Sequence, residues 1–472
     1  MRMRKVKHLT VAGLVMSGVL LLAAAIAAPA AWAEDDKDRQ IRELRELVER
    51  LGQRLNHLEQ GVGLKKEAVA VAPAPGAPAV PAETAQSLGD RIKGLEEALK
   101  SVPILSTMKD WQFGGHVAAS YNYNFRDPKS QNNTLRLFDD KANQFDINQA
   151  ELYVEKPTSE ASPIGFGLDV LLGRDAKKVH SLGLGISSSE DPTKTEPFDL
   201  TQAYVTYKVP IGKGLDLKGG KMVTLHGAEV IRRTGNFNIS RSLAFSYAIP
   251  FTHTGVMATY PFTDWLSTTV GIVNGWDNTD DNNRGKSFHG AATVTPPFLK
   301  DFALTVGGTW GAEQRFAGDT ANGPKRGLLD VIATYKPIAP LTLTLNYDYG
   351  RQPDLGVDPI TGTFVAGNQT AVWHAVAAYA TYDITDRISV GVRGEYFKDQ
   401  DGFRLPGATP GSKLEVWEAT LTGRYKLFDH VFASIEYRHD EATDNKKIFD
   451  RGDGTAKASS QNTIQGELIY QF

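Results

Sequence analysis

The stretch that decides the fold is the end of the chain, Asn462 to Phe472, which reads NTIQGELIYQF. Every second residue back from Phe472 is apolar or glycine, and most of the residues between them are polar. Side chains on a β-strand alternate between two faces, so this pattern predicts a strand with one apolar side. A soluble sheet could use the same alternation. An aromatic girdle at a membrane interface better explains a chain that ends on Phe472 with Tyr470 two residues before it.

The apolar face of this strand is similar to the terminal signal by which outer-membrane proteins are recognised for barrel assembly. The residues that carry the likeness are Leu468, Tyr470 and Phe472. We therefore expect outer-membrane lipid and the barrel-assembly machinery as partners.

The same alternation, with a period of two residues, also occurs earlier in the chain, from Trp111 onward. In the first such run, aromatic residues stand at both ends of the apolar face (Trp111, Phe113, Tyr121, Tyr123, Phe125) and small aliphatic residues in its middle. This is the order expected of a strand that crosses an outer membrane. Short connections alternate with long polar ones, among them Arg126 to Asn143 and Asp175 to Pro197. The sequence thus predicts an all-β fold, an antiparallel transmembrane barrel of about sixteen strands over residues 104–472, with both termini periplasmic and an aqueous lumen.

The start of the chain has the features of an export signal. Arg2, Arg4, Lys5 and Lys7 precede an apolar run that ends in Ala31-Trp32-Ala33, which predicts a signal peptide over residues 1–33. An uncleaved anchor is the alternative. The chain has no cysteine, which excludes disulfides, thiolate metal sites and haem attachment, and a formal net charge of -3, which gives no sign of a nucleic-acid partner.

Between the signal and the barrel the period changes. Residues 34–66 carry apolar positions at spacings of three and four and predict a short periplasmic coiled coil, with an amphipathic helix as the alternative. An Ala/Pro-rich linker over 67–86 and a second short heptad helix over 87–103 follow. This arrangement suggests a homo-oligomer, with a trimer favoured.

The lumen-facing side of the predicted strands carries charges of both signs, which would tune the passage of ions. The alternative is that these charges pair across neighbouring strands and stabilise the wall. The predicted pore-lining residues of the strands are Asp348, Arg393, Glu395, Glu418, Arg424, Glu436, Arg438 and Glu467.

The segment from His226 to Pro250 is too long for a hairpin turn and too apolar for a free loop. We expect it to fold into the barrel and narrow the pore, its apolar residues packing on the wall and its arginines facing the passage. An extracellular loop packed on its own side chains is the alternative. The predicted constriction residues are Glu229, Arg232, Arg233 and Arg241.

Several motifs around this segment are similar to those of the OmpL-like putative β-barrel porin family. They are Gly227-Ala228-Glu229-Val230, Asn238 to Ser242, Pro250 to Val256 and Asn274-Gly275-Trp276-Asp277, with Phe166-Gly167, Asp169 and Gly173 to Ala176 upstream. The resemblance covers residues 111–472 and implies an outer-membrane porin. It implies no substrate and no functional residues.

Passive diffusion of small hydrophilic solutes and ions through a water-filled channel is the first functional hypothesis, without catalysis, cofactors or a bound metal. Two alternatives are a barrel that tethers the envelope and an outer-membrane barrel enzyme of the lipase or protease type. Asp277, Asp280 and Asp281 could hold calcium, but their spacing is not that of an EF-hand, and a solvated loop is the simpler interpretation.

Overall fold

The structure, a computed structural model, describes residues 110–186, 196–313, 323–358, 361–452 and 457–472. The predicted signal peptide, coiled coil, linker and second heptad helix all lie outside the described residues.

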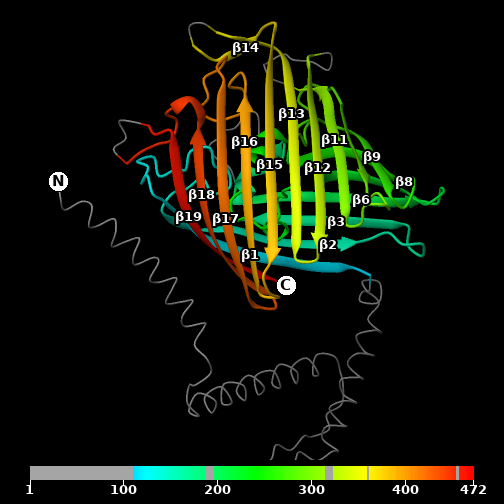
Figure 1. The fold of residues 1–472 in the computed structure, drawn as a ribbon. Helices are drawn as coiled ribbons and strands as arrows, with labels where there is room; N and C mark the ends of the chain where they lie inside the picture. Colours follow the sequence, from blue (N-terminus) through cyan, green and yellow to red (C-terminus); the bar gives the residue numbers. More distant parts are fainter. Residues whose placement is uncertain (1–109, 187–195, 314–322, 359–360, 453–456) are drawn as a thin grey trace, which may run out of the picture. The chain divides into compact units, whose positions relative to one another are not determined.

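The architecture is a closed antiparallel barrel (Figure 1). Seventeen strands form one sheet, and one of them, β14 (Phe364–Ala366), pairs only with the far end of β13. The remaining sixteen close the barrel because β1 pairs with β19. The sixteen are β1 (Gln112–Asn124), β2 (Gln144–Lys156), β3 (Ile164–Leu172), β6 (Phe198–Val209), β7 (Leu215–Val223), β8 (Thr252–Pro261), β9 (Leu266–Val273), β10 (Ser287–Val294), β11 (Phe302–Ala312), β12 (Lys325–Ile338), β13 (Leu341–Val357), β15 (Gln369–Asp383), β16 (Ile388–Asp399), β17 (Leu414–Phe428), β18 (Val431–Ala442) and β19 (Ser460–Gln471).

The alternation in sequence becomes an outside and an inside. On β19, Leu468 and Tyr470 are 51% and 50% exposed on the outer face, whereas Gln465 and Glu467 are buried inside. On β16, Val392 is likewise exposed on the outer face, whereas Arg393 and Glu395, which face inward, are buried. The predicted strand number and face assignment are therefore confirmed.

The last residue is tied into the barrel rather than frayed. Phe472 exchanges two backbone hydrogen bonds with Gly115 of β1, at 3.0 and 3.1 Å. The C-terminus lies at the end of the barrel that carries the tight turns, and the long connections and β14 lie at the opposite end (Figure 1). Two-residue strands β4 (Ser181–Leu182) and β5 (Gly185–Ile186) form a small separate sheet in one of these connections.

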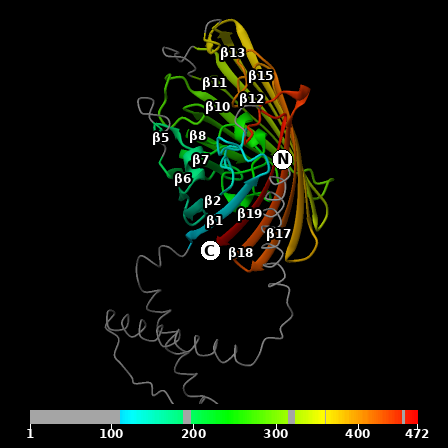
Figure 2. The ribbon, with the colours of Figure 1, turned by 90° about the vertical axis from the view of Figure 1, so that its left-hand side faces the viewer.

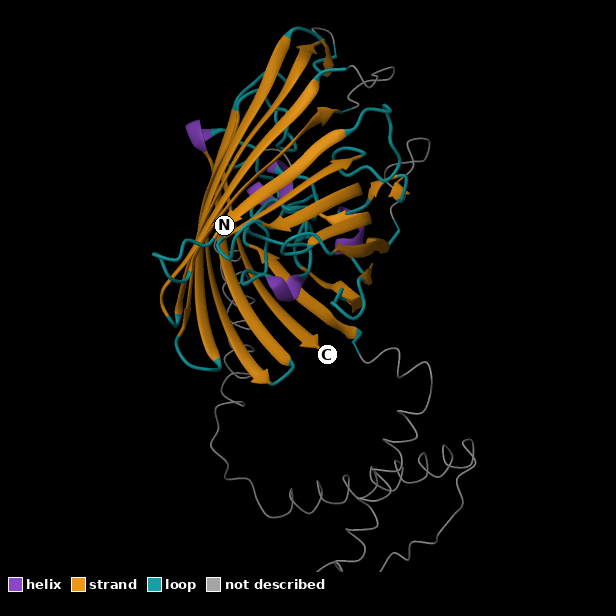
Figure 3. Cartoon of the chain, turned by 90° about the vertical axis from the view of Figure 1, so that its right-hand side faces the viewer, coloured by secondary structure: helices purple, strands orange, loops and turns teal. Residues whose placement is uncertain are grey.

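The interior of the barrel contains chain. Loops and short helical turns lie within the wall of strands in the side views (Figures 2 and 3). These interior turns are η1 (Asp175–Lys178), η2 (Arg233–Gly235) and η3 (Ala244–Ala248), whereas η4 (Thr443–Asn445), between β18 and β19, has no buried residue. None of the helices in the described residues is long and apolar enough to cross a membrane.

Candidate functional site

The connection between β7 and β8, residues 224–251, lies inside the barrel and is called the inner segment below. All five residues of η3 are buried. Phe245 of η3 packs against Phe251 and against Phe138, with ring centroids 5.2 and 5.8 Å apart. Phe138 belongs to the connection after β1, which the sequence predicts to be a long external loop. That connection therefore also turns inward, because Leu135 and Phe138 are buried in the same apolar cluster as the inner segment.

Carboxylates of the wall hold the backbone of the inner segment. Glu436 on β18 accepts hydrogen bonds from the N–H groups of Ile239 and Ser240, at 2.7 and 2.9 Å. Glu395 on β16 accepts from the N–H groups of Leu243 and Ala244 in the same way. A segment without regular secondary structure leaves many backbone groups unpaired, and an ionised acceptor is a strong partner for them.

Arginines of the wall hold the carbonyl groups. Arg393 donates to the carbonyl of Ser240 at 2.8 Å, and Arg438 donates to the carbonyl of Arg241 at 2.6 Å. Arg424 donates to the carbonyls of Asn236 and Phe237, both at 2.8 Å. The charges of both signs predicted on the lumen face thus bind the inner segment, and some of them also pair across neighbouring strands, as Arg393 and Arg438 do with Glu418.

The remaining predicted wall residues differ in their surroundings. Glu418 pairs with Arg393 at 2.6 Å, and Glu467 pairs with Arg233 of the inner segment at 2.5 Å. Asp348 lies directly opposite Asp330 on the neighbouring strand, and neither of its carboxyl oxygens has a hydrogen-bond partner among the residues that the structure describes.

The predicted constriction residues divide into buried and accessible ones. Glu229 is buried and pairs with Arg393 at 2.8 Å, and Arg233 is buried between Asp175 and Glu467. Arg241 donates to backbone carbonyls of its own segment. Arg233 and Arg241 therefore do not face the passage, contrary to the expectation, because their guanidinium groups bind buried carboxylates and carbonyl groups instead. Arg232, with its side chain 34% exposed, is the accessible one.

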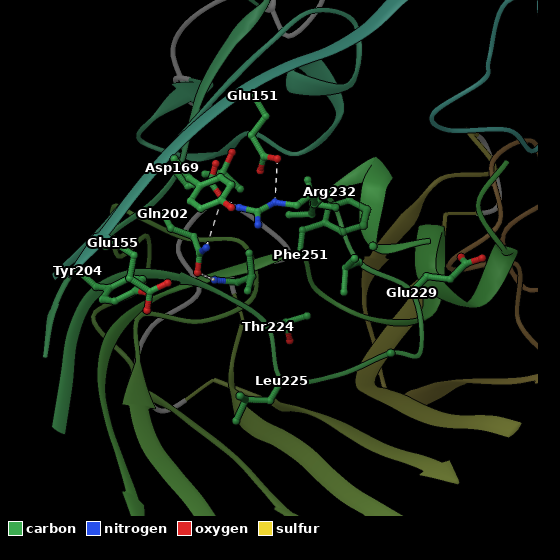
Figure 4. Close-up of a pocket in the computed structure, with 18 of the residues that line it drawn as sticks. Glu151, Glu155, Asp169, Gln202, Tyr204, Thr224, Leu225, Glu229, Arg232 and Phe251 are labelled. Carbon is green, nitrogen blue, oxygen red and sulfur yellow. Dashed lines mark hydrogen bonds and ion pairs between the residues drawn. The ribbon is translucent and has the colours of Figure 1, made fainter. Parts of the chain in front are cut away.

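Arg232 borders a cavity of about 520 Å³ between the inner segment and the wall, called the wall pocket below. Its Nε lies 2.8 Å from Oε2 of Glu151 on β2 in an ion pair, and its Nη2 donates to Asp169 on β3 at 3.1 Å (Figure 4). The guanidinium also stacks on the ring of Tyr153, 4.3 Å from the centroid. The wall side of the pocket is lined by Glu151, Tyr153, Glu155, Asp169, Gln202 and Tyr204.

Strand register places five of these six wall residues in two adjacent rows, and Glu151 lies outside both. Tyr153, Asp169 and Gln202 are partners across β2, β3 and β6, and Glu155 and Tyr204 flank Gly167 in the next row. A Cβ atom on Gly167 would lie 2.3 Å from the Tyr204 ring. Glycine is thus needed at this position for Tyr204 to lie across β3, which gives a physical reason for one of the sequence motifs.

Several site residues were missed in the sequence. Glu151, Asp169 and Asp175 all contact arginines of the inner segment, and Arg136 pairs with Asp440 at 2.8 Å. The strand residues among them share the inward parity, which could have identified them. Nothing in the sequence indicated that Arg136 turns inward, since its connection is polar overall.

The aspartates after β9 have structural roles. Asp277 accepts hydrogen bonds from the N–H groups of Phe251 and Thr252 at 2.7 and 2.9 Å, and Asp281 accepts from Asn283 and Arg284. Within the described part of the chain no group of three or more His, Asp or Glu side chains could hold a metal ion. The geometry gives no support to the calcium alternative.

A comparison with protein families gives one match. The family described as "Putative beta-barrel porin-2, OmpL-like" matches residues 110–472. No curated protein matches the chain.

Solved structures with a similar fold include several channels. An anion-selective porin from Comamonas acidovorans matches with a TM-score of 0.50 and 11% identity, over 77% of this chain and 99% of that one. The outer membrane channel DcaP of Acinetobacter baumannii matches with a TM-score of 0.49 and 13% identity, over 77% and 97%. OprB of Pseudomonas putida matches with a TM-score of 0.49 and 12% identity, over 79% and 97%. At these identities the likeness shows the fold alone.

Proposed function

The chain belongs to the OmpL-like β-barrel porin family, and we propose that it is a porin whose water-filled lumen passes small hydrophilic solutes and ions by diffusion. The proposal includes no bond chemistry, because size exclusion and the field of charged side chains suffice for such a channel.

One observation carries the proposal of a constriction: the inner segment occupies the lumen and is bound by charged side chains of several strands. Glu395, Arg393 and Glu436 each contact its backbone. A segment held at so many points would narrow the lumen permanently instead of opening and closing. The path left to solutes would then run along the wall pocket, where Glu151, Asp169 and Arg232 line the cavity.

The lack of cysteine in the chain makes a direct test possible. Purified protein carrying Thr224→Cys, in the wall pocket, is inserted in a planar bilayer and treated with a charged methanethiosulfonate reagent. We expect stable conductance steps that fall after modification. The matched control is Asp386→Cys, exposed in the tight turn after β15, whose conductance should not change. A barrel that does not conduct would contradict the porin function, and equal responses of the two variants would contradict the path along the pocket.

We also propose that the protein is a homo-oligomer in the outer membrane, with a trimer favoured, and that residues 34–66 form a coiled coil on the periplasmic side. Native mass spectrometry of the detergent-solubilised protein, with and without residues 34–103, tests both. A monomer in both preparations would contradict the oligomer.

A further inference from the structure

The wall pocket has an excess of carboxylates. The charged side chains on its wall side are Glu151, Glu155 and Asp169, and the inner segment contributes Arg232 as the guanidinium that faces them. Glu229, which also borders the cavity, is already paired with Arg393. Unpaired carboxylates inside a partly enclosed space are costly unless a cation compensates them.

Two of these carboxylates retain unused acceptors. Arg232 and Gln202 both donate to Oδ2 of Asp169, while Oδ1 is buried and has no hydrogen-bond partner in the described part of the chain. Glu155, in the next row of the wall, forms no ion pair with any described residue, although Tyr204 hydrogen-bonds to it and the ammonium of Lys218 lies near enough to interact with its charge. The side chain of Asp169 is 6% exposed and lies within hydrogen-bonding reach of Glu151, so either a proton shared with Glu151 or a cation inside the pocket can satisfy its free oxygen.

The aromatic faces of the same wall already bind cations. The guanidinium of Arg232 lies over Tyr153, and the ammonium of Lys218 lies over Tyr204, 4.2 Å from the ring centroid. Cations are attracted to the faces of aromatic rings, and more strongly where water is partly excluded. Arg232 thus shows which kind of group the pocket holds: a planar cation between two carboxylates and a tyrosine ring.

We propose that the wall pocket is a binding subsite for solutes that carry an ammonium or guanidinium group, with Oδ1 of Asp169 and the carboxylate of Glu155 as its acceptors. His116, which contacts Glu151 from within the wall at 3.0 Å, and Arg232 hold Glu151 in place and leave the other two carboxylates to the solute. The inference rests on the proposed function in that the solute would reach the pocket through the lumen.

The test is isothermal titration of the detergent-solubilised, full-length protein with agmatine at low salt, since salt screens such contacts. Glutarate is the anionic comparison. We expect binding of agmatine and not of glutarate, and a roughly tenfold or greater loss of affinity in Glu155→Gln and in Asp169→Asn, because each removes an ionised acceptor. Glu155→Gln disturbs no ion pair of the fold and is the variant of choice if Asp169→Asn folds poorly. Asp216→Asn is the matched control, an inward carboxylate on β7 that pairs with Lys208 and should leave the affinity unchanged.

The outcomes separate the two proposals when potassium chloride conductance is recorded on the same preparations. Conductance without agmatine binding would overturn the subsite and leave the porin intact. Agmatine binding without conductance would support the subsite and contradict the porin. Equal loss of affinity in Asp216→Asn and Glu155→Gln would also overturn the subsite, since it would show only a general effect of charge.

Discussion

Arg393 of β16 and Glu229 of the inner segment form a buried ion pair, with Nη1 of the arginine 2.8 Å from Oε1 of the glutamate and side chains 0% and 5% exposed. The same guanidinium also contacts Glu418 of the neighbouring strand and the carbonyl of Ser240. One wall residue thus joins the sheet to the chain inside it. A buried pair of this kind need not add net stability, but the loss of one partner leaves charges without compensation.

The first prediction follows from that asymmetry. Arg393→Gln should destabilise the barrel by about 3–5 kcal/mol, because Glu229 remains buried without its cation and Glu418 keeps only Arg438, at 3.5 Å. Urea unfolding in lipid vesicles, followed by tryptophan fluorescence, measures the change. Lys413→Gln is the matched control, since Lys413 pairs with Glu415 at an exposed position, and it should cost less than about 1 kcal/mol. Similar losses in both variants would show that the pair does not hold the inner segment.

The second prediction concerns two glycines on the two faces of the wall. A Cβ atom on Gly350 would lie 1.9 Å from the ring of Trp373, which is fully buried and donates to the carbonyl of Ala248 in η3. A Cβ atom on Gly394 would meet nothing within 4 Å. Gly350→Ala should therefore cost about 1–3 kcal/mol by overpacking and displace the tryptophan from η3.

The matched variant Gly394→Ala should change the free energy of unfolding by less than about 0.5 kcal/mol. Tryptophan emission of Gly350→Ala should also change in the folded state, because Trp373 would leave its hydrogen bond. Equal behaviour of the two alanine variants would contradict the close contact between β13 and Trp373.

The sequence predicts the wall far better than the contents of the barrel. Alternation over many strands specifies inside and outside residue by residue, so Leu468 and Glu467 could be assigned to opposite faces without a structure. The inner segment stands out by its length and apolar residues. Its partners do not, because contacts such as Glu436 with Ile239 join residues far apart in the chain and follow no period. For the same reason the burial of Arg241 and the inward turn of Phe138 could not be predicted.

The third prediction concerns pH. Burial raises the pKa of the Asp277 carboxyl to about 6, although two backbone N–H groups at the start of β8 oppose the shift. The ordinary value in an unfolded chain is about 3.9, so the folded state holds the proton more tightly. The contribution of Asp277 to the free energy of unfolding should therefore be fully present below about pH 4, and it should decline as the pH rises through about 6.

Unfolding midpoints in urea between pH 4 and pH 7 measure this contribution as the difference between the wild type and Asp277→Asn. The variant should lack the part of the pH dependence that belongs to Asp277. Asp264→Asn is the control, because Asp264 is fully exposed in a tight turn. A wild-type curve with the same shape as that of Asp277→Asn would contradict the raised pKa.

The fourth prediction tests which face meets lipid and at what depth. Leu468 lies on the outer face of β19 between Ala119 and Ala433, and we expect it near the middle of the membrane, whereas Phe428 is 71% exposed beside the tight turn before β18. A charge on the lipid face costs about 2–4 kcal/mol near the middle of the membrane and about 0–1 kcal/mol near its interface. Leu468→Arg should therefore lose about 2–4 kcal/mol relative to Leu468→Ala, and Phe428→Arg about 0–1 kcal/mol relative to Phe428→Ala. Reference to alanine at each position removes the cost of the lost side chain and leaves the cost of the charge. Reversible unfolding in vesicles of defined thickness measures all four variants, and equal costs at the two positions would contradict the depth assigned to Leu468.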